Sequence, residues 1–234
     1  KLPYVDAAYE TRGARIIDAD VSPCWWIDNG NIEAYTLKQG GALMIPVISH
    51  ETENAPVKIS VSTEKAGLDK DAETYSWVFD MEDPRQFSRE EMLSPDWRGK
   101  SIMRKRFVKK EEKLGDRLEV GITARPLLLS LVLVTQVPAM TCGVNGRNAQ
   151  ILLPGTLDVD ISGRLDHDLK KLDLKITSRK DKAEIMAYFP GSWGEPRILS
   201  GADEISCLKK DEFGMTFYVF GVNKGTSNIT LMQK

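Results

Sequence analysis

Apolar and polar residues alternate along several short stretches of this chain. The alternation is clearest in Val57–Thr63, Leu157–Ser162 and Leu172–Thr177, where Val, Ile or Leu recurs at every second position. Successive residues of a strand point to opposite faces of a sheet, so this pattern predicts strands with one dry and one wet face. Such stretches recur at spacings of roughly 8–12 residues with turn signals between them, which is typical of a sandwich or barrel.

The most apolar stretch of the chain is Arg125–Pro138, with the sequence RPLLLSLVLVTQVP. A proline lies near each end, and the interval is shorter than the roughly 20 apolar residues that a membrane-spanning helix needs. Leu, Val and Thr without Gly are typical of a strand that is buried on both faces. We therefore predict that Leu127–Val137 is a central strand around which the other strands pack.

Turns and one helix complete the expected elements. Glu64–Ala72 is interpreted as a polar turn, and Thr141–Asn148 as a turn because it is rich in Gly and Asn. Asp83–Ser94 has the strongest helix signal, with Pro84 at the first helical position and Pro95 at the end. Together these elements predict an all-β protein, an antiparallel β-sandwich that is jelly-roll-like, with one short helix in a long loop.

The domain organisation follows from length and from the lack of a repeat. Lys1–Gly13 is polar and is interpreted as an N-terminal arm. Residues 14–234 are predicted to form a single sandwich domain, because no internal repeat is visible. The alternative is two sandwich modules of about 115 residues each, at 14–115 and 116–234, a length that suits such domains.

Composition excludes several classes of protein. With 41% hydrophobic and 28% charged residues, the chain is an ordinary folded one rather than a disordered one. The net charge is −2, so nucleic-acid binding has to come from a local patch. Cys24, Cys142 and Cys207 are widely spaced, and there are only two histidines. The sequence therefore predicts no disulfide framework, no metal site and no cofactor.

The sharpest charge signal is the basic segment Lys100–Lys110, KSIMRKRFVKK. In a strand, Arg104 and Arg106 share one face and Lys105 lies on the other. Such a strip can hold the phosphates of a nucleic acid or another polyanion. The alternative, which charge runs more often represent, is a charged edge strand that discourages pairing with other chains. The candidate polyanion-binding residues are Lys100, Arg104, Lys105, Arg106, Lys109 and Lys110.

Tryptophans provide a second candidate surface. Trp25 and Trp26 are adjacent in a turn-rich segment that also contains Asp and Asn. Adjacent strand residues face opposite sides, so we expect one ring in the core and the other facing out. An exposed Trp can stack on a sugar or anchor a protein interface, and Trp97 and Trp193 would extend that platform. The alternative is that these rings close the ends of the core.

Carboxylates give a weaker catalytic signal. Asp158 and Asp160 project from one face of a predicted strand, as paired carboxylates do in glycosidases. They alternate with apolar residues as on any wet face, so no catalytic residue is assigned. Asp166-His167-Asp168 lacks the serine elbow of a hydrolytic triad and is interpreted as a hairpin tip.

These features predict a non-enzymatic structural or assembly protein. Its most concrete version is a shell-forming subunit of the virus-capsid type, with an arm and a local basic strip. The expected partners are copies of itself or sibling subunits, and nucleic acid through the basic strip, and no membrane span is expected. One alternative is a surface module that binds carbohydrate or protein through exposed Trp loops, and another is a polysaccharide-acting enzyme. A virion or intracellular location is favoured over the cell surface.

Overall fold

Strands account for most of the chain. The computed structural model describes residues 15–16, 25–28, 30–81, 88, 90, 103–111, 113–200, 208–212 and 215–234. Contacts divide the described residues into two compact units, one up to Gln136 and one from Val137 onward. No helix within these ranges is long and apolar enough to span a membrane. The two units are described separately below.

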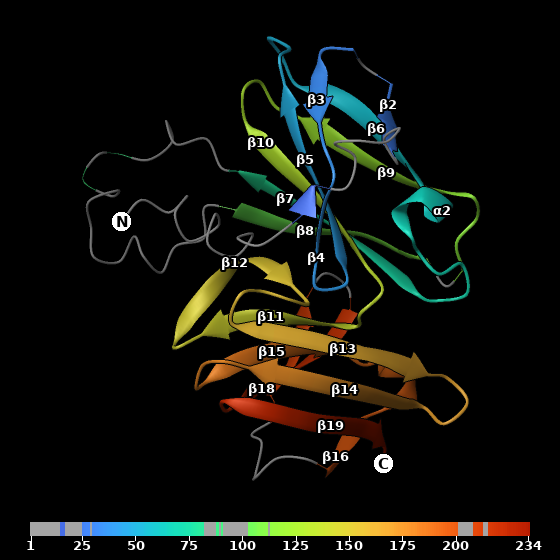
Figure 1. The fold of residues 1–234 in the computed structure, drawn as a ribbon, viewed down its shortest axis with the longest axis vertical. Coiled ribbons are helices and arrows are strands. Elements are labelled where there is room, and N and C mark those ends of the chain that lie inside the picture. The colour runs from blue at the N-terminus through green and yellow to red at the C-terminus, as the bar shows by residue number, and fades with distance from the viewer. Residues whose placement is uncertain are drawn as a thin grey trace. The chain divides into compact units, whose positions relative to one another are not determined.

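The first unit contains two antiparallel sheets (Figure 1). Sheet A has the order β1 (Arg15–Ile16), β4 (Leu37–Gln39), β5 (Ala42–Ser49), β10 (Leu129–Thr135), β7 (Thr74–Met81) and β8 (Met103–Glu111), and β3 (Ile32–Ala34) also pairs with β5. Sheet B has the order β2 (Trp25–Ile27), β6 (Ala55–Ser62) and β9 (Arg117–Ala124).

The two sheets of the first unit enclose one hydrophobic core. Ile45, Val78 and Val132 of sheet A belong to the same buried cluster as Ile59 and Val120 of sheet B. Strand β9 alternates strictly between exposed and buried positions, because every second residue is apolar and faces this core. The first unit is therefore a β-sandwich, as the alternating pattern predicted.

Strand β10 confirms the predicted central strand. It pairs with β5 on one side and β7 on the other, and six of its seven residues are buried. The strand is shorter than predicted, because Leu127 lies before it with a φ of 54° and is 77% exposed. A positive φ is outside the β region, so the chain enters the strand only at Leu129.

A helical turn forms where the sequence predicted the start of a polar turn, and its capping residues explain the difference. Thr63–Ala66 forms a single helical turn, α2, within and just before the segment interpreted as a polar turn. The Ser62 side chain accepts a hydrogen bond from the Lys65 amide, and Gly67 ends the turn with a φ of 66°. Of the predicted helix Asp83–Ser94 only Ser88 and Glu90 are described, and the predicted arm Lys1–Gly13 lies outside the described residues.

The second unit also contains two antiparallel sheets. Sheet C has the order β12 (Arg147–Leu153), β11 (Ala139–Val144), β15 (Ala183–Tyr188), β18 (Met215–Val222) and β17 (Leu208–Glu212). Sheet D has the order β13 (Val159–Asp166), β14 (Lys171–Ser178), β19 (Gly225–Gln233) and β16 (Pro196–Ser200).

The core of the second unit lies between sheets C and D. Ile185 and Phe220 of sheet C cluster with Ile161, Leu172 and Ile229 of sheet D. This unit is a second β-sandwich, so the predicted all-β, antiparallel sandwich class is confirmed. The boundary between the two compact units falls after Gln136 in the sequence. It is therefore later in the chain than the Gly115 boundary of the two-module alternative. Whether the chain folds as one domain or two remains a prediction, which domain-resolved calorimetry would test.

Turn residues set the hairpins of this unit. The segment Thr141–Asn148, predicted as a turn, is mostly strand, and only Asn145-Gly146 turns the chain between β11 and β12. These two residues have φ values of 53° and 73°, which suits a two-residue hairpin loop. His167 and Asp168 lie in the connection between β13 and β14, which confirms the predicted hairpin tip.

The outer face of sheet D holds a carboxylate with a lowered pKa. Burial raises the pKa of Asp173, but hydrogen bonds from Lys171 and Thr230 and the charges of Lys171 and Arg164 outweigh it. The two oxygens of Asp173 lie 2.7 Å from Lys171 Nζ and 2.7 Å from Thr230 Oγ1. The pKa therefore lies below its usual 3.8.

We expect Thr230→Val to move the pKa of Asp173 back toward its usual value, because the replacement removes a donor to the charged form. A lowered folded-state pKa contributes stability above the unfolded-state pKa, and this contribution is lost as the pH falls through the folded-state value. NMR titration of the Asp173 carboxyl carbon measures the shift. Thr226→Val is the control, since Thr226 contacts Thr177 instead. An unchanged pKa in Thr230→Val would contradict the assigned cause.

Candidate functional site

The outer face of sheet B is polar and regular. Strands β6 and β9 pair Lys58 with Gly121, Ser60 with Glu119 and Ser62 with Arg117. The residues between them, such as Val57, Ile59 and Val61, belong to the core, so these three pairs lie on the outer face. Lys58 Nζ lies 2.8 Å from Glu119 Oε1, and both side chains are about half exposed. Ser60, between these larger neighbours, is buried.

Strand β2 is the third strand of sheet B and pairs with β6. Its register aligns Trp25 with Val61 and Trp26 with Ser60. Val61 is a core residue, and Ser60 lies on the outer face of sheet B. The expectation that the two tryptophans face opposite sides stays a prediction. After the strand, Asp28 Oδ1 accepts a hydrogen bond from the Lys58 amide at 3.1 Å.

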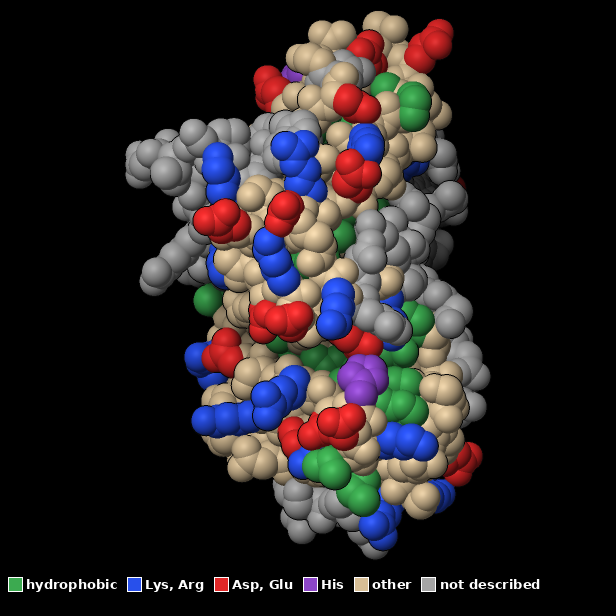
Figure 2. Space-filling model, turned by 90° about the vertical axis from the view of Figure 1, so that its right-hand side faces the viewer, with side chains coloured by type: hydrophobic (Ala, Val, Ile, Leu, Met, Phe, Trp, Pro, Cys, Tyr) green, Lys and Arg blue, Asp and Glu red, His purple; other side chains and the backbone are tan. Residues whose placement is uncertain are grey.

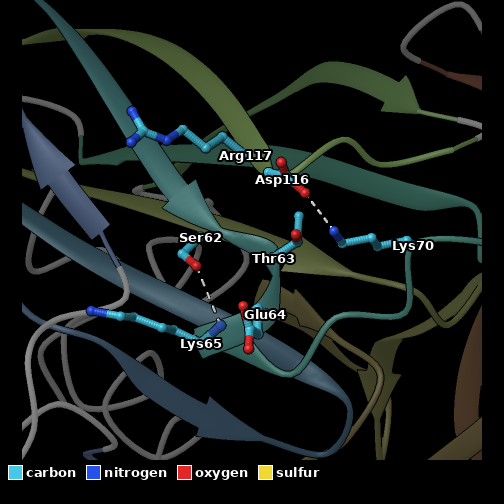
Figure 3. A pocket seen from close by; sticks show the side chains of 7 residues that line it. All are labelled: Ser62, Thr63, Glu64, Lys65, Lys70, Asp116 and Arg117. Atoms are coloured by element: carbon cyan, nitrogen blue, oxygen red, sulfur yellow. Dashed lines mark hydrogen bonds and ion pairs between the residues drawn. The ribbon is translucent and has the colours of Figure 1, made fainter.

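A hollow of about 410 Å³ lies where this outer face ends. Figure 3 shows its lining side chains, which come from the end of β6, from α2, from the following loop and from the start of β9. The Thr63 hydroxyl donates to the Gly115 carbonyl at 3.0 Å, and the Thr63 amide donates to the Asp116 carbonyl at 3.1 Å. These bonds fasten α2 to the segment that begins β9. The lining residues are Ser62, Thr63, Glu64, Lys65, Lys70, Asp116 and Arg117.

An ion pair crosses one side of the hollow. Lys70 Nζ donates to Asp116 Oδ1 at 2.5 Å. This hydrogen bond is the main reason why the pKa of Lys70 is raised and that of Asp116 is lowered, and the attraction between the two charges adds to it. The lining carries three cationic side chains and two carboxylates, so its net charge is positive.

The described part of the basic strip lies on β8, at the end of the described strands of sheet A. Strand β8 is the last strand in the described order of sheet A, and its register aligns Arg104 with Asp80, Lys105 with Phe79 and Arg106 with Val78. Lys109 aligns with Ser76, next to a bulge. Lys100 lies outside the described residues.

Lys110 does not serve as a free cation of this strip. Its Nζ lies 3.0 Å from Glu73 Oε1, and the Tyr75 hydroxyl donates to the other oxygen of Glu73 at 2.6 Å. The Lys110 and Glu73 side chains are only 24% and 12% exposed. A partly buried carboxylate therefore neutralises the charge of Lys110, and the contact of Lys110 with a polyanion stays a prediction.

Trp193 does not form an exposed platform. It lies in the 3-10 turn η3 (Gly191–Trp193) and is only 7% exposed. The rings of His167 and Phe189 each contact it edge-on, with centroids 5.2 Å away. This burial contradicts sugar stacking on Trp193 and fits the alternative of a ring that closes one end of the core. Trp97 lies outside the described residues.

The paired carboxylates and the cysteines do not form a site in the described parts of the chain. Arg179 Nη2 lies 2.9 Å from Asp160 Oδ2, and Arg179 Nη1 donates to the Leu157 carbonyl. Asp160 is thus engaged by an arginine beside Asp158. No group of three metal-binding side chains occurs within the described ranges. Of the three cysteines only Cys142 lies within the described ranges, and Cys24 and Cys207 are outside them.

Acidic and basic side chains are interspersed over the surface that Figure 2 draws, which is the side on which Figure 1 shows β2, β6 and α2. Neither sign dominates a broad area of this view. A mixed surface does not attract an extended polyanion as a single-sign surface does.

Comparisons with known proteins give little further guidance. No protein-family model matches the chain. No curated protein matches it. Among solved structures, it is similar to a β-porphyranase of glycoside hydrolase family 86 from the human gut bacterium Bacteroides plebeius, with 11% sequence identity and a TM-score of 0.22. That match covers 88% of this chain and 34% of the enzyme chain. A TM-score this low carries no argument.

Proposed function

We propose that this chain is a non-enzymatic binding module that recognises a carbohydrate on the outer face of sheet B. The observation that carries the proposal is the polar outer face of β6 and β9, together with the strand register that aligns Trp26 of β2 with Ser60 and Ser60 with Glu119. An aromatic ring supplies a flat apolar surface for the C–H face of a sugar. Asp28 and Lys58 lie beside these positions, and together with Glu119 they supply acceptors and a donor for hydroxyl groups.

The shape of this region supports a ligand longer than one sugar. These positions lie on a regular sheet, and the hollow follows them along β6 and β9. A flat face that ends in a hollow fits an extended chain with one group placed in the hollow. A binding site on such a face needs little rearrangement when the ligand binds, because paired strands hold the side chains at fixed spacings.

Trp26→Ala should weaken polysaccharide binding about tenfold or more, because an aromatic anchor often carries much of the binding free energy of a site. Isothermal titration calorimetry against a panel of soluble polysaccharides measures the loss. Trp26→Phe should keep most of the affinity, which separates loss of the ring from loss of the fold. Asn228→Ala, on the exposed face of sheet D, is the control. Failure of the wild-type protein to bind any glycan would overturn the proposal.

A second candidate function is assembly with copies of this chain or with sibling chains. The observation that favours it is the position of β8, which pairs with β7 on one edge and with no described strand on the other. A free strand edge is a template for pairing with another chain. A shell-forming subunit is the most concrete version of this candidate, and its basic strip would face packaged nucleic acid.

Light scattering at low and high salt tests the assembly candidate. A mass of many subunits would support it, whereas a monomer of 26.2 kDa under both conditions would contradict assembly from this chain alone. Joint replacement of Arg104, Lys105 and Arg106 by Ser should weaken nucleic-acid binding and flatten its salt dependence if the strip binds phosphates. Unchanged binding would indicate that the basic residues of β8 instead discourage this strand from pairing with other chains.

A further inference from the structure

We propose that the carbohydrate lies directly on the backbone of β9 at Gly121, and that the sugar unit placed there is uncharged. This inference rests on the proposed carbohydrate-binding function. It names a specificity-determining residue and the chemical class of the ligand, a neutral polysaccharide. The observation that carries it is a glycine in the interior of a regular strand, at a position where the fold itself gives no reason for one.

The usual structural reasons for a glycine within a strand do not apply to Gly121. A bulge is one such reason, but the register of β6 with β9 is continuous from Ala55 to Ser62. A positive φ is another, and Gly121 does not have one. Close packing is the third, yet a Cβ on Gly121 would meet no heavy atom of the described residues within 4 Å. The reason that remains is the close approach of a ligand to the backbone.

The surroundings of Gly121 suit the apolar face of a sugar ring. Gly121 is exposed on the outer face of sheet B, in register with Lys58 of β6. The next outward-facing pair along the two strands is Pro56 with Thr123, and both of these residues are exposed. Gly121 Cα and the Pro56 ring are diagonal neighbours, so they give this part of the face an apolar floor on which C–H groups can pack.

The ion pair beside this floor carries no net charge. Lys58 Nζ lies 2.8 Å from Glu119 Oε1, and both side chains are about half exposed. The pair joins the residue opposite Gly121 to the preceding outward-facing position of β9. An ammonium group donates and a carboxylate accepts, which matches sugar hydroxyls because these do both. Since the two opposite charges lie side by side, they offer no net attraction to a carboxylated or sulfated sugar.

Gly121→Val tests the contact with the backbone. Strand side chains stand roughly perpendicular to the sheet, so valine would occupy the space above β9 that the sugar is proposed to fill. Gly121→Val should lower the affinity for the best-bound neutral polysaccharide at least about tenfold, and Gly121→Ala should lower it by a smaller factor. Isothermal titration calorimetry of the full chain with a soluble β-glucan, a xylan and a neutral galactan measures both losses. Thermal unfolding should show no loss of stability, because the space is open and valine favours strands.

Gly221→Val is the matched control. Gly221 is also an exposed strand glycine, on β18 of the second sandwich, and a Cβ there would likewise meet no heavy atom of the described residues within 4 Å. This variant should bind polysaccharide as the wild type does. Equal losses of affinity in the two variants would overturn the inference. Lower stability of Gly121→Val would also overturn it, because the fold would then have its own reason for the glycine.

Polygalacturonate tests the class of the ligand. The wild type should bind its best neutral polysaccharide at least about tenfold more tightly than polygalacturonate. Added salt should leave the affinity for the neutral polysaccharide unchanged, because screening acts on charged groups. Equal or tighter binding of polygalacturonate would refute the neutral class.

The outcomes separate this inference from the function on which it rests. If Trp26→Ala abolishes binding of the neutral polysaccharide and Gly121→Val leaves it intact, the carbohydrate function stands and the contact at Gly121 is refuted. If the wild type binds no sugar, the proposed function fails. Loss of binding in Gly121→Val at unchanged stability, with full binding by Gly221→Val, supports both.

Discussion

Leu131→Ala should lower the free energy of unfolding by about 2–5 kcal/mol, the range for removing a buried leucine side chain. Leu131 is 3% exposed and lies in the middle of β10, in register with Pro46 of β5 and Phe79 of β7. Strands β5 and β7 flank Leu131 on both sides, so the neighbouring backbone cannot readily collapse into the cavity that the substitution leaves. Urea unfolding followed by circular dichroism should show a lower midpoint with an unchanged slope.

Leu127→Ala is the matched control for this prediction. The same substitution occurs four residues earlier in the same apolar run, but Leu127 is largely exposed. Its effect should stay within about 0.5 kcal/mol, as for ordinary surface changes. Equal effects at the two positions would show that β10 is not the buried centre of sheet A.

Gly163→Ala should destabilise the protein by about 1–3 kcal/mol, the range for forcing extra atoms into a packed region. A Cβ on Gly163 would overlap the carbonyl oxygen of Asp173 and would lie 2.6 Å from Leu174 Cδ2 and 3.2 Å from Leu174 Cα. Two of these three contacts are with the backbone of β14, the direct partner of β13, so relief requires the paired strands to separate.

Gly121→Ala, in the first sandwich, is expected to have the opposite effect. Gly121 lies within β9, and a Cβ there would have no heavy atom within 4 Å. Because Gly in a strand interior costs roughly 0.5–1 kcal/mol relative to Ala, this replacement should be neutral or stabilising by up to that amount. Thermal unfolding of both variants measures the contrast. Stabilisation in Gly163→Ala would contradict the tight approach of β13 and β14.

The candidate site was only partly predictable from the sequence. The expectation that Trp25 and Trp26 face opposite sides followed from their adjacency in an extended segment, and it stays a prediction. The sequence also carries signals for the ends of α2, since Ser62 precedes the turn and Gly67 follows it, although the segment was interpreted as a polar turn. The ion pair of Lys70 with Asp116 was not, because the two residues are 46 positions apart in the chain. Nothing in the local pattern of either residue points to the other.

Exposure of single large residues was the least predictable property. Trp193 and Leu127 are both apolar residues next to Gly or Pro, yet one is buried and the other is not. Trp193 is buried because Phe189 and His167, from separate parts of the second sandwich, close around its ring. The ion pair of Lys110 with Glu73 was unpredictable for a similar reason, because the pairing of β7 with β8 brings the two residues together.

The sequence by itself determined the class of structure and the positions of many strands. Alternation with a period of two identifies the core residues of β9, β13 and β14, because strand geometry alone sends every second side chain inward. Tertiary structure decided which strands became neighbours, and therefore that β2, β6 and β9 form one sheet, whose outer face along β6 and β9 is polar with a hollow at its end. The physical reason is that periodicity records which side of a strand is buried but not which strand covers or flanks it. Partners distant in the chain are selected by the packing of the whole core.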